Sequence, residues 1–121
     1  MPIHRVLVVD DSKTELLHLG EILRGAGYEV DTAQNADDVR AKLEQSRPDL
    51  ILMDVVMPGK NGFQLTREIT RDPRYAGMPV IMCTSKNQET DRVWGMRQGA
   101  CGYLVKPVQK EDLMSKIKAL G

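Results

Sequence analysis

Five short apolar runs rich in Val, Ile and Leu alternate along the chain with longer segments in which apolar residues recur every three or four positions. The runs lie at residues 4–9, 28–33, 49–53, 78–83 and 102–105. Most of them are apolar on both faces, as in buried parallel strands, whereas the segments between them have the period of amphipathic helices. The alternation predicts a (βα)5 chain, that is, a doubly wound α/β fold with helices on both faces of a parallel five-stranded sheet.

The second run, 28–33 (YEVDTA), alternates apolar and polar residues and therefore fits an edge strand. We expect the flavodoxin-like strand order 2-1-3-4-5. No repeat or interdomain linker interrupts the pattern, so we expect a single domain over residues 1–121. The expected apolar helix positions are Leu16, Leu19, Leu23, Ala26, Ala36, Val39, Leu43, Leu65, Ile69, Leu113, Ile117 and Leu120.

Two helix starts carry capping signals. Ser12 precedes Glu15 by three residues, and Asn35 precedes Asp38 by three. Each pair places a side-chain oxygen where it can accept a hydrogen bond from the first turn of a helix. Gly27 marks the end of the first helix.

The net charge and the cysteines indicate which binding partners and which cellular compartment to expect. Seventeen basic and seventeen acidic residues cancel, so we expect neither nucleic acid nor a membrane surface as partner. No apolar stretch is long enough to span a membrane, and no secretory leader is visible. Cys83 and Cys101 fall toward opposite ends of neighbouring strands, which predicts two free, mostly buried thiols in a reducing cytoplasm.

Three acids follow two strands that should be adjacent. Asp10 and Asp11 come directly after the first strand, and Asp54 follows the third. Ligands of doubly wound sheets bind beyond the carboxyl ends of the strands, where the strand order reverses. Crowded carboxylates repel one another, and hard oxygen ligands suit Mg²⁺, so we expect a divalent cation here.

Two further polar side chains should reach the same edge. Thr84 ends the fourth strand, and Lys106 follows the fifth. A metal ion, a hydroxyl and an ammonium around one carboxylate form a cage for a phosphoryl group, in which Asp54 is the nucleophile.

Four motifs carry a resemblance to a known family. The motifs LVVDDS, LMDVVMPGKNG, VIMCTS and GYLVKP, spread over the whole chain, resemble those of the receiver domains of two-component response regulators, which have the CheY-like fold. The resemblance implies that Asp54 accepts a phosphoryl group from a phosphohistidine of a histidine kinase or phosphotransfer domain. It also implies that Mg²⁺ is bound by Asp11, Asp54 and the backbone carbonyl of Val56, with Asp10 acting through water.

The same resemblance implies how the switch operates. Lys106 and Thr84 would hold the phosphoryl oxygens, and the Lys106–Pro107 peptide would be cis. Thr84 would move toward the phosphate and Tyr103 would turn inward, which changes the face of the fourth helix, fifth strand and fifth helix that binds an effector protein. We expect a monomeric phosphoacceptor protein rather than an enzyme.

A narrower resemblance links the segments NGFQLTREITRD and KNQETDRVWGMRQGA to the single-domain regulators of type IV pilus twitching motility. It implies a role in pilus-driven motility or chemotaxis-like signalling. Two other roles stay open, namely a phosphate sink or relay intermediate without its own effector, and a receiver cut from a longer regulator. By the same resemblance, Val56 and Lys86 occupy the two positions that govern phosphate lifetime. The flagellar regulators have polar and acidic residues there, so their fast decay is no basis for an expectation about this chain.

Two enzyme-like or cofactor-binding alternatives fit less well. A phosphatase of the haloacid dehalogenase kind needs a second acid two residues after its nucleophile, where this chain has Val56. A flavodoxin needs a Ser, Thr and Gly-rich phosphate loop after the first strand, where this chain has DDSKTE. Acidic residues at that position would repel a bound phosphate unless a metal ion lay between them.

Other conspicuous residues have ordinary explanations. Trp94 lies in the fourth helix beside Val93, which better fits the buried stripe, so Trp94 either covers the core or lies partly exposed on the partner face. Gly95 lowers the intrinsic stability of that helix. His4 and His18 fall outside the apolar pattern and are expected on the surface.

Overall fold

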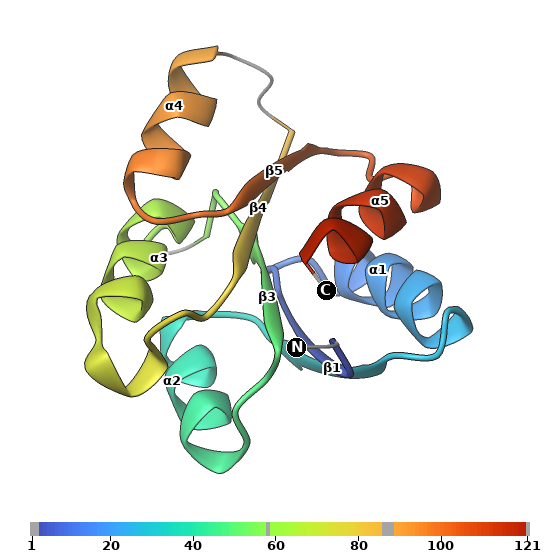
Figure 1. The fold of residues 1–121 in the computed structure, drawn as a ribbon, viewed down its shortest axis with the longest axis horizontal. Coiled ribbons are helices and arrows are strands. Elements are labelled where there is room, and N and C mark those ends of the chain that lie inside the picture. Colours follow the sequence, from blue (N-terminus) through green and yellow to red (C-terminus); the bar gives the residue numbers. More distant parts are fainter. Residues whose placement is uncertain (1–2, 58, 86–88, 121) are drawn as a thin grey trace.

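The structure, a computed structural model, describes residues 3–57, 59–85 and 89–120, without the side chain of Asp91. Its strands form one parallel sheet in the order β2-β1-β3-β4-β5, as predicted (Figure 1). The strands are β1 (Arg5–Val9), β2 (Glu29–Ala33), β3 (Leu50–Asp54), β4 (Val80–Thr84) and β5 (Gly102–Val105). The helices are α1 (Lys13–Gly25), α2 (Ala36–Gln45), α3 (Gly62–Arg71), α4 (Glu89–Arg97) and α5 (Lys110–Leu120), with a 3-10 turn at Pro73–Tyr75.

Helices cover both faces of the sheet. Figure 1 shows α1 and α5 on one side of the strands and α2, α3 and α4 on the other. Side chains alternate between the two faces, so Val8 packs in the apolar cluster of α1 and α5, and Leu7 in the cluster of α2 and α3. All five residues of the central strand β3 are buried, whereas the edge strand β2 keeps most of its residues partly exposed.

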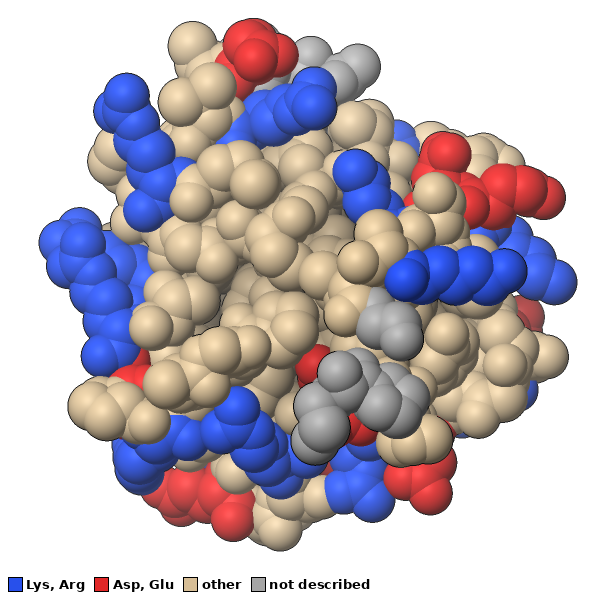
Figure 2. Space-filling view, in the orientation of Figure 1, with Lys and Arg blue, Asp and Glu red and all other residues tan. Residues whose placement is uncertain are grey.

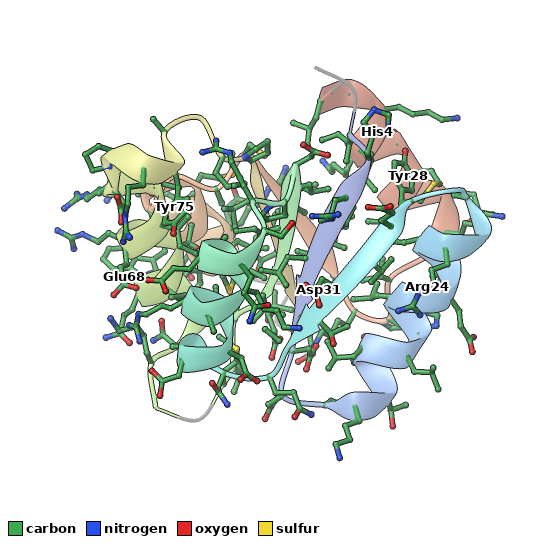
Figure 3. The ribbon with its side chains drawn as sticks, turned by 90° about the horizontal axis from the view of Figure 1, so that it is seen from below. His4, Arg24, Tyr28, Asp31, Glu68 and Tyr75 are labelled. Atoms are coloured by element: carbon green, nitrogen blue, oxygen red, sulfur yellow. The ribbon has the colours of Figure 1, made fainter. Side chains whose placement is uncertain are left out.

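The pairing registers align the carboxyl ends of the inner strands. Val9 pairs with Met53, so Asp10 and Asp54 lie at the same level of β1 and β3. Asp54 in turn pairs with Cys83, and Thr84 pairs with Val105. The sheet therefore brings the candidate residues of four strands to one edge, which lies at the bottom of Figure 3.

Local capping fixes where the helices begin. The Ser12 hydroxyl accepts a hydrogen bond from the Glu15 N–H at 3.4 Å, and the Asn35 side chain accepts one from the Asp38 N–H at 2.9 Å, as predicted. A reciprocal capping box at α3, between Asn61 and Gln64, was not predicted. Asn61 and Gln64 side chains each bond the backbone N–H of the other residue, at 2.9 and 3.1 Å.

The end of α1 differs in detail from the sequence expectation. Gly27 has a φ of 96°, a conformation that favours glycine after a helix, as its predicted role requires. Ala26, predicted to lie on the apolar stripe, is instead the exposed C-cap residue of α1.

Helix α4 corrects another expectation. Val93 was predicted to be buried, but it is 42% exposed and Trp94 is 49% exposed. Among the described residues of α4, only Gly95 is buried, because the helix approaches the Phe63 ring and Met82 through this glycine. A Cβ atom at residue 95 would lie 3.2 Å from the Phe63 ring, so glycine allows the contact.

The positions of the cysteines and histidines match the predictions, except for the exposure of Cys101. Cys83 and Cys101 are both free, and burial raises the pKa of the Cys83 thiol to about 12. Cys101 is exposed rather than buried, because it precedes β5 at the amino edge of the sheet. His4 and His18 lie on the surface.

The surface mixes both signs of charge. On the face shown in Figure 2, Lys and Arg side chains are spread around the rim with Asp and Glu side chains among them. Within the part of the chain that the structure describes, no helix is both long enough and apolar enough to cross a membrane.

Candidate functional site

Three carboxylates meet at the carboxyl edge of the sheet. Oxygens of Asp10, Asp11 and Asp54 lie within 4.8 Å of one another. Asp10 follows β1 and Asp54 ends β3, and both side chains are buried, whereas Asp11 is exposed. The sequence predicted this cluster because adjacent parallel strands end side by side.

Lys106 joins two of these acids. Its ammonium donates hydrogen bonds to Asp10 Oδ2 at 2.5 Å and to Asp54 Oδ1 at 3.0 Å. The backbone N–H of Lys106 donates to the Thr84 carbonyl, and the following Lys106–Pro107 peptide is cis, as predicted. The end of β5 thus places a cation directly beside the proposed nucleophile.

Burial and neighbouring charges act in opposite directions on these groups. Burial raises the pKa of Asp54 and the charges of Asp10 and Asp11 add to the rise, although the hydrogen bond from Lys106 works against it. Burial would lower the pKa of Lys106, but its hydrogen bonds to Asp10 and Asp54 outweigh this and raise it. The ammonium therefore stays charged, and a further cation would favour the ionised form of Asp54.

Both oxygens of Asp10 already accept hydrogen bonds. Oδ1 accepts from the Ser12 N–H at 2.9 Å, and Oδ2 accepts from Lys106. These bonds fix the position of the Asp10 carboxylate. Asp11 and Asp54 have more freedom to offer oxygens to a metal ion.

Other predicted residues lie around this centre. Thr84 ends β4 and is buried, one position beyond the pairing partner of Asp54. Tyr103 on β5 is partly buried and packs against the apolar cluster beneath α2 and α3. Val56, two residues after Asp54, is 57% exposed, and Lys86 lies outside the described residues.

The connection between β3 and α3 closes tightly behind Asp54, a feature that the sequence did not predict. The Gly62 N–H donates to the Val55 carbonyl at 2.8 Å. A Cβ atom on Gly62 would lie 2.0 Å from the Asp54 carbonyl oxygen, so only glycine fits there. Gly-rich turns of this kind bring backbone close to a reacting group.

The donor set fits a hard divalent cation. Mg²⁺ prefers oxygen ligands and is commonly held by one or two carboxylates together with water and phosphate oxygens. The partly exposed cluster offers carboxylate oxygens on one side and access from solvent on the other. The ammonium of Lys106 lies 3.0 Å from Asp54 Oδ1 and offsets part of the negative charge of the cluster.

Known proteins with similar sequences point to one family. Residues 6–118 match the response regulator receiver domain family. The chain is 51% identical over 116 residues to the protein PilH of Pseudomonas aeruginosa, and the match covers 96% of each protein.

Solved structures have the same arrangement of elements. The chemotaxis protein CheY4 of Vibrio cholerae superposes with a TM-score of 0.90 at 33% identity, covering 97% of this chain and 98% of CheY4. The signal receiver domain of a signal transduction histidine kinase from Syntrophus aciditrophicus gives a TM-score of 0.88 at 34% identity, covering 97% and 89% of the two chains.

Proposed function

Because the chain belongs to the response regulator receiver domain family, we propose that it is a phosphorelay switch whose phosphoacceptor is Asp54. The observation that carries the proposal is the position of this carboxylate. Asp54 is buried at the end of the central strand, with the Lys106 ammonium 3.0 Å away and two further acids within 4.8 Å.

The chemistry is a transfer of a phosphoryl group between side chains. A carboxylate oxygen of Asp54 attacks the phosphorus atom of a phosphohistidine on a histidine kinase or phosphotransfer domain. The new O–P bond forms as the P–N bond breaks, and the imidazole nitrogen keeps the electron pair. Lys106 donates hydrogen bonds to the phosphoryl oxygens as their charge develops, and the Thr84 hydroxyl is the second donor.

We assign Mg²⁺ to the acidic cluster. Asp11, Asp54 and the Val56 carbonyl would hold it, with Asp10 acting through water. When bound, the ion neutralises charge on the carboxylates and on the transferred phosphoryl group. The residues of the chain then orient the donor and keep Asp54 ionised.

The output surface proposed here is the face of α4, β5 and α5. It exposes four large apolar residues, namely Val93, Trp94 and Met96 on α4 and Val105 on β5. Exposed apolar patches of this kind mark protein contacts. We propose that inward rotation of Tyr103 after phosphorylation changes the shape of this face and thereby its affinity for an effector protein.

The biological output that we propose is control of type IV pilus twitching motility. The support is the identity to PilH over nearly the full length of both proteins. A phosphate sink for a kinase shared with another regulator would use the same site and needs no effector. Binding of the phosphorylated form to a partner, with loss of binding in Asp54→Asn, separates the switch from the sink.

The chemical part of the proposal is tested by intact mass spectrometry. The protein is incubated with acetyl phosphate, with and without Mg²⁺, beside Asp54→Asn and the exposed control Asp112→Asn. We expect one phosphoryl adduct that requires Mg²⁺ and Asp54 and is retained by the Asp112 variant. An adduct that persists in Asp54→Asn would contradict the assignment.

A further inference from the structure

Glu68 joins three parts of the fold that are separate in sequence. Arg40 of α2 donates to both of its oxygens, from Nε to Oε2 and from Nη2 to Oε1, each at 3.0 Å. Lys60, in the connection between β3 and α3, donates to Oε1 at 2.8 Å. The hydrogen bonds from Arg40, followed by those from Lys60, lower the pKa of Glu68 to about 2.

Lys60 lies in the connection between β3 and α3, which follows Asp54. Lys60 lies between Val56 and the start of α3 at Gly62. The capping box of Asn61 fixes one side of Lys60, and the Gly62 to Val55 hydrogen bond closes the connection onto Asp54. The ion pair therefore holds a connection that is anchored at its ends and whose described residues, 55–57 and 59–61, lie in no strand or helix.

We propose that Glu68 is a positioning residue for the phosphoryl site, because it joins Lys60 to α3 and, through Arg40, to α2, and so keeps the connection after Asp54 in the conformation that presents Val56. The proposal rests on the proposed function, in which the Val56 carbonyl binds Mg²⁺. Neither Glu68 nor Lys60 needs to touch the metal ion. Their effect reaches Val56 through the described backbone of this connection.

A second ion pair in the same protein provides a matched comparison. Lys42 of α2 contacts Asp31 of β2 at 2.9 Å, with side-chain exposures of 35% and 38%. The Lys60–Glu68 pair has a distance of 2.8 Å and exposures of 36% and 39%. The two pairs are therefore equally exposed to solvent. Figure 3 shows Glu68 and Asp31 on opposite sides of α2, so the Lys42–Asp31 pair lies away from the connection.

The test compares Lys60→Met and Glu68→Gln with Lys42→Met, and uses Lys60→Arg as the rescue variant. Calorimetric titration with Mg²⁺ should show a dissociation constant about two- to fivefold higher in the first two variants, as expected for an exposed ion pair. Lys42→Met and Lys60→Arg should stay close to the wild type. All variants should unfold at similar temperatures.

Amide hydrogen exchange without metal gives a second, independent measurement. Lys60→Met and Glu68→Gln should speed exchange at Val55–Met57 and Gly59–Asn61, and Lys42→Met should not. If the wild type binds no Mg²⁺, the proposed function fails, and the exchange rates still decide whether Glu68 holds the connection. Unchanged exchange, or an equal effect of Lys42→Met on Mg²⁺ affinity, would overturn the proposal.

Discussion

Substitution of Gly62 by alanine should disturb the connection between β3 and α3, because among the glycines that the structure describes Gly62 leaves the least room for a Cβ atom. The added Cβ atom would lie 2.0 Å from the Asp54 carbonyl oxygen and 2.9 Å from the Val55 Cα atom, and both neighbours are backbone. Neither can move as a flexible side chain would. The connection must therefore shift, which breaks the 2.8 Å hydrogen bond from the Gly62 N–H to Val55.

The expected cost follows from these two effects. Overpacking costs about 1–3 kcal/mol, and a lost buried hydrogen bond adds about 1 kcal/mol. Gly62→Ala should thus lower the free energy of unfolding by roughly 2–4 kcal/mol in urea denaturation. It should also slow labelling by acetyl phosphate, since the carbonyl that moves belongs to Asp54.

Gly25→Ala is the matched control for this experiment. Gly25 ends α1, and a Cβ atom there would have no neighbour within 4 Å. The better helix propensity of alanine should leave stability unchanged or raise it by up to about 1 kcal/mol. A Gly62→Ala protein as stable as the Gly25→Ala protein would refute the close-approach argument.

Three further outcomes are expected. Lys106→Ala should reduce the rate of acetyl phosphate labelling of Asp54 by at least about tenfold, because an electrostatic donor is lost, while circular dichroism shows a retained fold. Backbone hydrogen bonds lower the pKa of Asp49 below 3.8, so its stabilisation is complete above that pH and disappears as the pH falls through the folded value. Urea titrations should therefore show that Asp49→Asn costs more at pH 6 than at pH 3, and an equal cost would refute the link. A disulfide reagent should modify Cys101 in the native protein and Cys83 only after unfolding. Rapid reaction of both thiols in the native state would contradict the burial of Cys83.

Much of the fold could be predicted because its signals are local. Apolar runs and helical periods are properties of neighbouring residues, and they predict the strands and helices. The strand order then followed from the doubly wound fold class and the edge pattern of residues 28–33. The acidic cluster could also be predicted, since the ends of parallel strands share one edge of the sheet. Asp10 and Asp54 are therefore brought together by topology alone.

The features that could not be predicted depend on distances between elements. Arg40 and Glu68 are 28 residues apart and meet only because α2 packs beside α3. The exposure of Val93 follows from the approach of α4 through Gly95, which the apolar period of a short helix does not reveal. The close contact of Gly62 with Asp54 likewise appears only once the connection is folded.

Phosphorylation of Asp54 is decided by locating the phosphoryl group in the chain. After incubation with acetyl phosphate and Mg²⁺, the acyl phosphate is reduced with borohydride and the modified residue is identified by tandem mass spectrometry. We expect the modification on Asp54, and none without Mg²⁺. A modification at Asp10, Asp11 or a histidine would contradict the assignment of Asp54. So would the absence of any modification in a protein that binds Mg²⁺, if phosphohistidine donors also failed to phosphorylate it.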